Sequence, residues 1–264
     1  MIAQTFARCR AEARAALIGF LTAGYPALDR TPAMVKAAIE GGADMIELGF
    51  PFSDPLADGP IIQASSQAAL AGGATFDAVL DTAAACLFGA PLIAFSYFNP
   101  LFARGIERSA ADLRSAGFHG AVIPDLPLEE SAELRAAFAR NGLAIAFLVA
   151  PTTPRERAGT IADFSTAFVY VAGRMGVTGT HSAVDASLKK RLHELRAQTE
   201  KPLAVGFGVS TAAHVRTLAH DADAVVVGSA LVDASSRGEN DVRELCTALR
   251  AGTARDGSQR LVRT

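Results

Sequence analysis

The chain has 264 residues, of which 50% are hydrophobic and 20% charged, and its formal net charge is −2 at pH 7. This length and apolar content can bury one large core or two smaller ones. The charge is nearly balanced and forms no basic block or stripe, which argues against nucleic acid or an anionic membrane as the main partner.

The cysteines and the apolar runs indicate where the protein works. Cys9, Cys86 and Cys246 are far apart and odd in number, which favours neither a disulfide framework nor a metal site. The N-terminus has no long apolar core after a basic start, and no apolar run approaches the roughly 20 residues of a membrane span. We therefore expect a cytoplasmic protein, with the three cysteines in the core or on helix faces.

Apolar runs, separated by glycine and proline, predict strands and helices that alternate along the chain. Strands are predicted at 16–22, 45–49, 92–96, 120–123, 143–149, 167–171, 203–205 and 224–227. Helices are predicted at 2–13, 31–40, 60–71, 75–88, 106–116, 129–140, 154–163, 184–199, 211–219 and 239–250, with Ser210 as the N-cap of the helix that ends at 219.

The predicted strands are continuous apolar runs, which indicates a parallel sheet covered on both faces. About eight strand–helix units in roughly 250 residues are typical of a closed (β/α)₈ barrel, so we predict a single barrel domain over residues 1–264. An open doubly wound sheet is the alternative. The absence of a GxGxxG pattern after the first strand and the spread of unusual residues over many strand ends argue against it.

The stretch ELGFPFSDPLADGPIIQ, residues 47–63, is dense in residues that carry chemistry. Glu47 is a carboxylate on an apolar strand, which is costly unless the group is paired or used. The alternative is a core glutamate whose hydrogen bonds are satisfied. Burial predicts a raised pKa for Glu47, which could then exchange a proton near neutral pH. Asp58 lies in the loop and should stay ionised, ready to accept a hydrogen bond from a substrate N–H or to stabilise a cation.

The last two predicted strands end in glycine runs, Gly206-Phe207-Gly208 followed by Val-Ser, and Gly228-Ser229. Glycines let main-chain N–H groups approach an anion, and each run leads into a predicted helix N-terminus. Loops after the seventh and eighth strands are the usual phosphate site of this barrel. The sequence therefore predicts a phosphate ligand here, with plain turn chemistry as the alternative. The glycine-rich loop at 173–180 predicts a lid.

Other kinds of chemistry find little support. No serine or cysteine lies in a recognisable nucleophile setting, and the predicted strand ends carry no lysine for a Schiff base. The histidines are scattered through loops and helices without metal-ligand spacing, and we interpret them as surface residues: His119, His181, His193, His214 and His220. We expect no metal site.

Six motifs together resemble one family, the α subunit of tryptophan synthase, from about residue 17 to residue 233. They are ELGFPFSDPLADGPIIQ (47–63), FSYFNP (95–100), IPDLPLEE (123–130), RMGVTG (174–179), GFGVS (206–210) and VVGSA (226–230). The resemblance implies a (β/α)₈ lyase that cleaves indole-3-glycerol phosphate to indole and glyceraldehyde 3-phosphate by acid–base catalysis, without a metal or an organic cofactor.

The resemblance also implies roles for individual residues. In the family's pattern, the carboxylate at Glu47 handles the protons and the one at Asp58 binds the indole N–H. Further positions match the indole site (Phe20, Tyr170), the phosphate site (Gly179, Gly208, Gly228, Ser229), its neighbours (Gly206, Phe207) and the lid residue that contacts the catalytic aspartate (Thr178). Two positions at the start of the lid depart from the pattern, because Gly173 replaces a frequent serine and Met175 a frequent serine or threonine.

Members of this family pair with a β subunit that carries pyridoxal phosphate and receives indole through a tunnel, in an α₂β₂ heterotetramer. The matching contact face would include Pro51, Asp54 and Asn99, and pyridoxal phosphate is not expected on this chain. Two other hypotheses stay open from the sequence. One is another phosphate-sugar barrel enzyme, such as an epimerase or isomerase, and the other is an inactive subunit that only activates its β partner.

Overall fold

The computed structural model describes residues 1–173, 186–206 and 208–255, and its centre is a closed parallel barrel with strands in the order β1 to β8. β1 pairs with both β2 and β8, so the barrel prediction is confirmed and the open-sheet alternative is wrong. The strands are β1 (Ala16–Thr22), β2 (Met45–Gly49), β3 (Leu92–Phe95), β4 (Gly120–Val122), β5 (Ala144–Val149), β6 (Val169–Ala172), β7 (Leu203–Gly206) and β8 (Ala224–Val227).

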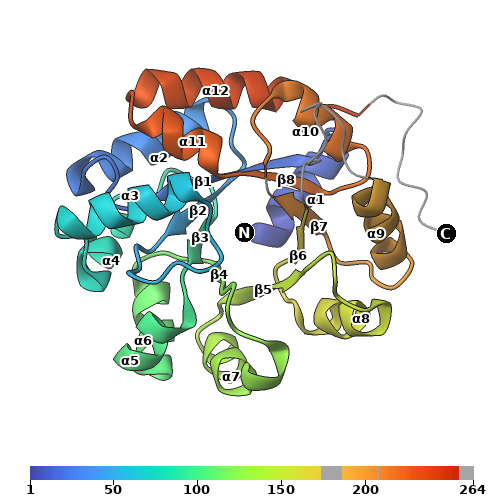
Figure 1. The fold of residues 1–264 in the computed structure, drawn as a ribbon, viewed down its shortest axis with the longest axis horizontal. Helices are drawn as coiled ribbons and strands as arrows, with labels where there is room; N and C mark the ends of the chain where they lie inside the picture. Colours follow the sequence, from blue (N-terminus) through green and yellow to red (C-terminus); the bar gives the residue numbers. More distant parts are fainter. Residues whose placement is uncertain (174–185, 207, 256–264) are drawn as a thin grey trace.

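Helices surround the strands, as Figure 1 shows. The α-helices are α1 (Ile2–Ala11), α2 (Thr31–Glu40), α3 (Pro60–Ala71), α4 (Phe76–Ala84), α5 (Phe98–Arg104), α6 (Ile106–Ser115), α7 (Ala132–Arg140), α8 (Arg155–Phe164), α9 (Ala186–Arg196), α10 (Ala212–Ala219), α11 (Ser229–Ser235) and α12 (Glu239–Ala251). Short 3₁₀ helices span Leu28–Arg30 and Leu128–Glu130.

The structure corrects several predicted helices. α5 was not predicted, and α11 begins at Ser229, where a helix N-terminus was expected but no helix bounds were predicted. The Asn-Pro of α5 resembles a loop, and the helix begins where the Asp125 carboxylate accepts a hydrogen bond from the Phe98 N–H at 2.8 Å, a contact between distant segments. Thr211, not Ser210, caps α10, because its side chain accepts from the His214 N–H. The helix predicted at 129–140 is a 3₁₀ turn followed by α7.

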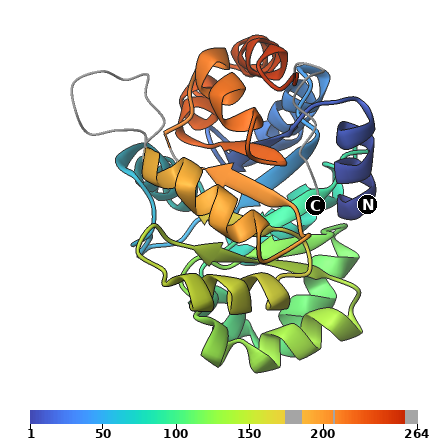
Figure 2. The ribbon, with the colours of Figure 1, turned by 90° about the vertical axis from the view of Figure 1, so that its right-hand side faces the viewer.

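The N-terminal end of the barrel is plugged. α1 inserts Ile2, Phe6 and Cys9 among inward-facing strand side chains, and Figure 2 shows α1 at one end of the molecule. The Phe6 ring lies 6.0 Å from that of Phe168, which lies 6.4 Å from Tyr170. This aromatic column fills the barrel axis from the plug upward, so space for a ligand is left at the C-terminal ends of the strands.

A buried ion pair links the segments that precede β1 and β2 at the N-terminal end of the barrel. Arg14, just before β1, and Asp44, just before β2, form two hydrogen bonds of 2.7 Å, and the Leu17 N–H also donates to Asp44. Burial alone would raise the pKa of Asp44, but the bonds from Arg14 and Leu17 lower it. We assign this ion pair a structural role, because catalytic residues of this fold lie at the opposite end of the barrel. The three cysteines are buried and unpaired, as predicted.

None of the helices that the structure describes combines the length and the apolar character that a membrane span needs.

Candidate active site

A pocket of about 400 Å³ opens at the C-terminal ends of the strands. It brings together seven residues that the sequence singled out from five different strand ends and loops. They are Phe20, Glu47, Asp58, Tyr170, Gly208, Gly228 and Ser229.

Glu47 lies in the middle of β2, every residue of which is buried, and only 1% of its own surface is exposed. Within the described part of the chain, neither carboxylate oxygen has a hydrogen-bond partner. Burial raises the pKa of Glu47 to about 8, so the group is mostly protonated at pH 7 and can donate a proton. An unsatisfied buried carboxyl that faces a pocket is typical of a catalytic group, and the alternative of a satisfied core glutamate loses its support.

Asp58 lies in the loop between β2 and α3 and is half-buried. Burial raises its pKa to about 6, while a hydrogen bond from Tyr97 lowers it. The loop is thus less polar around Asp58 than the sequence suggested, although the carboxylate is still mostly ionised at pH 7. Glu47 is therefore mostly uncharged and Asp58 mostly ionised at neutral pH, which allows Glu47 to act as an acid and Asp58 as a fixed negative charge. A third carboxylate, Asp233, also lines the pocket and pairs with Arg237.

Tyr170 on β6 closes the floor of the pocket. Burial, followed by the charges of Glu47 and Asp58, raises its pKa well above the ordinary value, so the phenol stays protonated. Its hydroxyl occupies the space that a side chain at Gly206 would need. Gly206 is thus required for packing, and it does not itself line the pocket.

Two aromatic rings form the apolar wall. The rings of Phe20 and Phe95 meet edge to face, with centroids 5.3 Å apart. Gly49 leaves room for Phe20, because a Cβ at position 49 would lie 2.6 Å from that ring. Sequence reasoning missed Phe95 as well as Ile62 and Val226, although Phe95 could have been found as an aromatic residue at a strand end in the motif FSYFNP.

The opposite end of the pocket is lined by main chain and small residues. Gly208 has φ +73°, a conformation that favours glycine, and Gly228 and Ser229 follow β8. Among the described lining residues there is no lysine or arginine. An anion bound here would therefore be held by main-chain N–H groups and by the hydroxyls of Ser210 and Ser229.

The remaining predicted residues lie elsewhere. Pro51 is half-buried and Asp54 and Asn99 are exposed, and these three do not line the pocket. Thr178, Gly179 and Phe207 lie outside the described residues, as does the predicted lid beyond Gly173, including Met175.

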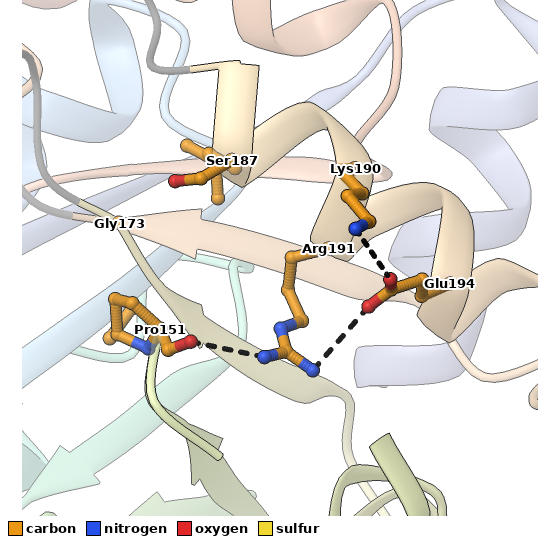
Figure 3. A pocket seen from close by; sticks show the side chains of 8 residues that line it. Pro151, Gly173, Ser187, Lys190, Arg191 and Glu194 are labelled. Carbon is orange, nitrogen blue, oxygen red and sulfur yellow. Dashed lines mark hydrogen bonds and ion pairs between the residues drawn. The ribbon is translucent and has the colours of Figure 1, made fainter. Parts of the chain in front are cut away.

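A second, smaller pocket of about 240 Å³ lies beside Gly173 (Figure 3). Arg191 on α9 crosses it, donating to the Pro151 carbonyl at 3.0 Å and pairing with Glu194 at 3.6 Å, and Lys190 pairs with Glu194 at 3.9 Å. A Cβ at position 173 would lie 2.7 Å from the Leu188 side chain. The unusual glycine at 173 is thus matched to the close packing of α9 against the end of β6.

In the parts of the chain that the structure places, no group of three or more His, Cys, Asp or Glu side chains could hold a metal ion.

Comparison with known proteins places the chain in a family. The family model for the tryptophan synthase alpha chain matches residues 6–256. The tryptophan synthase alpha chain of Thermosynechococcus vestitus is 45% identical over 255 residues, which cover 94% of this chain and 96% of the relative. That of Arabidopsis thaliana is 40% identical over 234 residues, covering 88% and 85%.

Solved structures agree with this result. A chain in a structure of Mycobacterium tuberculosis tryptophan synthase superposes with a TM-score of 0.90 at 38% identity, covering 97% of this chain and 98% of that one. The tryptophan synthase subunit alpha of Legionella pneumophila gives 0.86 at 30% identity, covering 95% and 97%. The fold and the pocket define a (β/α)₈ enzyme whose pocket contains the carboxyl groups of Glu47 and Asp58. The chain belongs to the tryptophan synthase alpha chain family.

Proposed function

We propose that the pocket between Glu47, Asp58 and Ser229 is the active site for the family's reaction. Membership of the family makes the chain a carbon–carbon lyase of tryptophan biosynthesis, which cleaves indole-3-glycerol phosphate to indole and glyceraldehyde 3-phosphate. The observation that carries the assignment is a buried Glu47 carboxyl without a partner among the described residues, in one pocket with the half-buried Asp58 and opposite a glycine-lined end. Burial raises the pKa of Glu47 to about 8 and that of Asp58 to about 6.

The reaction requires one proton transfer from Glu47 to the substrate and one from the substrate back to Glu47. Glu47 donates a proton to C3 of the indole ring, which leaves a positive charge shared with the ring nitrogen. The resulting Glu47 carboxylate then accepts the proton of the 3′-hydroxyl. A carbonyl forms at that carbon, the bond between the side chain and C3 breaks, and its electrons neutralise the ring. Glu47 ends protonated again, as acid–base catalysis requires.

The other lining residues bind and orient the substrate. Asp58 accepts a hydrogen bond from the indole N–H and stabilises the charge that develops there, an electrostatic effect that grows in a pocket that excludes water. The rings of Phe20 and Phe95 pack against the indole. Gly208, Gly228 and Ser229 hold the phosphate at the glycine-lined end of the pocket. By resemblance to the family's pattern, we assign Gly179 to the same phosphate site, Gly206 and Phe207 to its neighbours, and Thr178 to the contact with the catalytic aspartate.

The chain works as one domain, 1–264, in the cytoplasm, without a cofactor of its own. Its partner is a tryptophan synthase β subunit, which carries pyridoxal phosphate, in an α₂β₂ heterotetramer. The contact face includes Pro51, Asp54 and Asn99. Two exposed apolar side chains support this assignment, Leu56 at 93% and Phe102 at 60% exposure, because apolar surface beside polar residues is typical of interfaces.

The phosphate site is tested by Gly208→Asp, which adds a negative charge at a position with φ +73°. We expect this variant to bind glycerol 3-phosphate at least tenfold more weakly than the wild type, through repulsion and crowding. Gly142→Asp is the matched control, because Gly142 also has positive φ (+66°) but lies in the exposed turn after α7. Equal affinity of Gly208→Asp and Gly142→Asp in a calorimetric titration would overturn the phosphate assignment.

A further inference from the structure

The hydroxyl of Tyr97 forms hydrogen bonds with two adjacent residues of the loop between β2 and α3, Ala57 and Asp58. It follows β3, and only 4% of its surface is exposed. Its hydroxyl donates to Oδ2 of Asp58 at 3.0 Å and accepts from the Ala57 N–H at 2.9 Å. A main-chain N–H can only donate, so the phenol oxygen must be the acceptor from Ala57, and its one proton is directed at Asp58.

The Tyr97 ring is itself held in place. The ring of Phe52 packs against it, with centroids 5.3 Å apart and planes inclined by 30°. The next residue, Phe98, begins α5, whose first N–H is bound by Asp125. Packing against Phe52 and the bond from the next residue to Asp125 therefore hold the Tyr97 side chain in place without a ligand, which is the arrangement that preorganised catalytic groups need.

Within the described chain, this is the one side-chain hydrogen bond that the Asp58 carboxylate accepts. It occupies Oδ2 and leaves Oδ1 for another donor. We propose that Tyr97 is a positioning residue for the lyase reaction: it fixes Oδ2 of Asp58 so that Oδ1 meets the ring N–H of an indole substrate. This inference rests on the proposed function of the pocket.

The bond also acts on the charge of Asp58. The hydrogen bond from Tyr97 lowers the pKa of Asp58 against the opposing effect of burial. Among the described residues, the titratable groups that line the pocket with Asp58 are Glu47 on β2, Tyr170 on β6 and Asp233 on α11, and Asp125 acts on Tyr97. Both Glu47 and Tyr170 are mostly uncharged at pH 6–7 because burial raises their pKa values, so loss of the Tyr97 hydroxyl should change the pH dependence through Asp58.

The test is Tyr97→Phe, assayed as kcat/KM for indole-3-glycerol phosphate between pH 5 and 9. We expect the acid limb of the profile to move up by about one pH unit, so that the activity ratio of wild type to variant grows toward tenfold as the pH falls below 6. Tyr25→Phe is the matched control, because Tyr25 does not line the pocket, and its profile should follow the wild type. Thermal unfolding shows whether each variant is folded.

The assays distinguish a failure of the Tyr97 role from a failure of the proposed lyase function. A Tyr97→Phe enzyme whose acid limb stays in place, whether its activity is normal or uniformly reduced, overturns the positioning role, since a merely structural tyrosine would act equally at every pH. If wild type and Tyr25→Phe release no indole at any pH, the proposed function fails, and the role of Tyr97 fails with it.

Discussion

Phe20 on β1 and Glu47 on β2 are register partners in the barrel sheet. Neighbouring residues in register on parallel strands point to the same side, so the aromatic ring and the carboxyl group enter the pocket together. The ring keeps water from Glu47, and that burial raises the pKa of the carboxyl to about 8. In the proposed mechanism, the apolar surface assigned to indole binding thus also raises the pKa of the acid that acts on the substrate.

The activity should therefore follow a bell-shaped pH profile. Asp58 must be ionised, so kcat/KM is expected to fall as the pH drops below about 6. Glu47 must be protonated for the first step, so kcat/KM should also fall as the pH rises above about 8. Steady-state kinetics of indole release from pH 5 to 9 measures both limbs. A profile that rises steadily through pH 8 would contradict the assignment of Glu47 as the acid.

Glu47→Gln should make the protein more stable. The folded pKa of about 8 lies above the ordinary value of 4.5, so the folded state loses stability as the pH rises from about 4.5 to 8, and a neutral glutamine does not. At pH 7 we expect a gain in the free energy of unfolding of about 3 kcal/mol, measured by urea denaturation.

Glu244→Gln on the exposed face of α12 is the control for that measurement, with an expected change within about 0.5 kcal/mol. The gain for Glu47→Gln should shrink toward zero at pH 4. A Glu47→Gln protein that is less stable than the wild type at pH 7 would show that the carboxyl is paired and satisfied in the folded protein.

Gly173→Ser should destabilise the chain through Leu188. A Cβ at position 173 would lie 2.7 Å from the Leu188 Cδ2, and overpacking of this kind costs about 1–3 kcal/mol. In a Leu188→Ala background the same serine should cost much less. A double-mutant cycle on unfolding free energies measures the coupling, and strictly additive costs would show that Gly173 and Leu188 are not matched.

Much of the barrel could be predicted, because its signals are local. Apolar runs such as Met45–Gly49 and the glycines that end helices set the order of strands and helices, and strand ends of a parallel barrel meet at one face. Glu47, Asp58, Gly208 and Ser229 were therefore predicted as one site, and the pocket contains all four.

The rest depends on contacts between distant segments. α5 begins where Asp125 binds the Phe98 N–H, and no local pattern announces that bond. Tyr97 reaches Asp58 across 39 residues, so its role is visible only once the loops after β2 and β3 are placed side by side. The pKa of Asp58 depends on how deeply the loop folds inward, which the polar sequence around it does not reveal.

The most direct test is indole release by the purified chain from indole-3-glycerol phosphate, with Glu47→Gln beside the wild type. The chain contains no tryptophan, so indole fluorescence is read against a low background. We predict that the wild type releases indole and that Glu47→Gln is slower by on the order of 10²–10⁴-fold, while its affinity for glycerol 3-phosphate is unchanged. A Glu47→Gln rate close to that of the wild type, or no indole from the wild type either alone or with its β partner, would contradict the account.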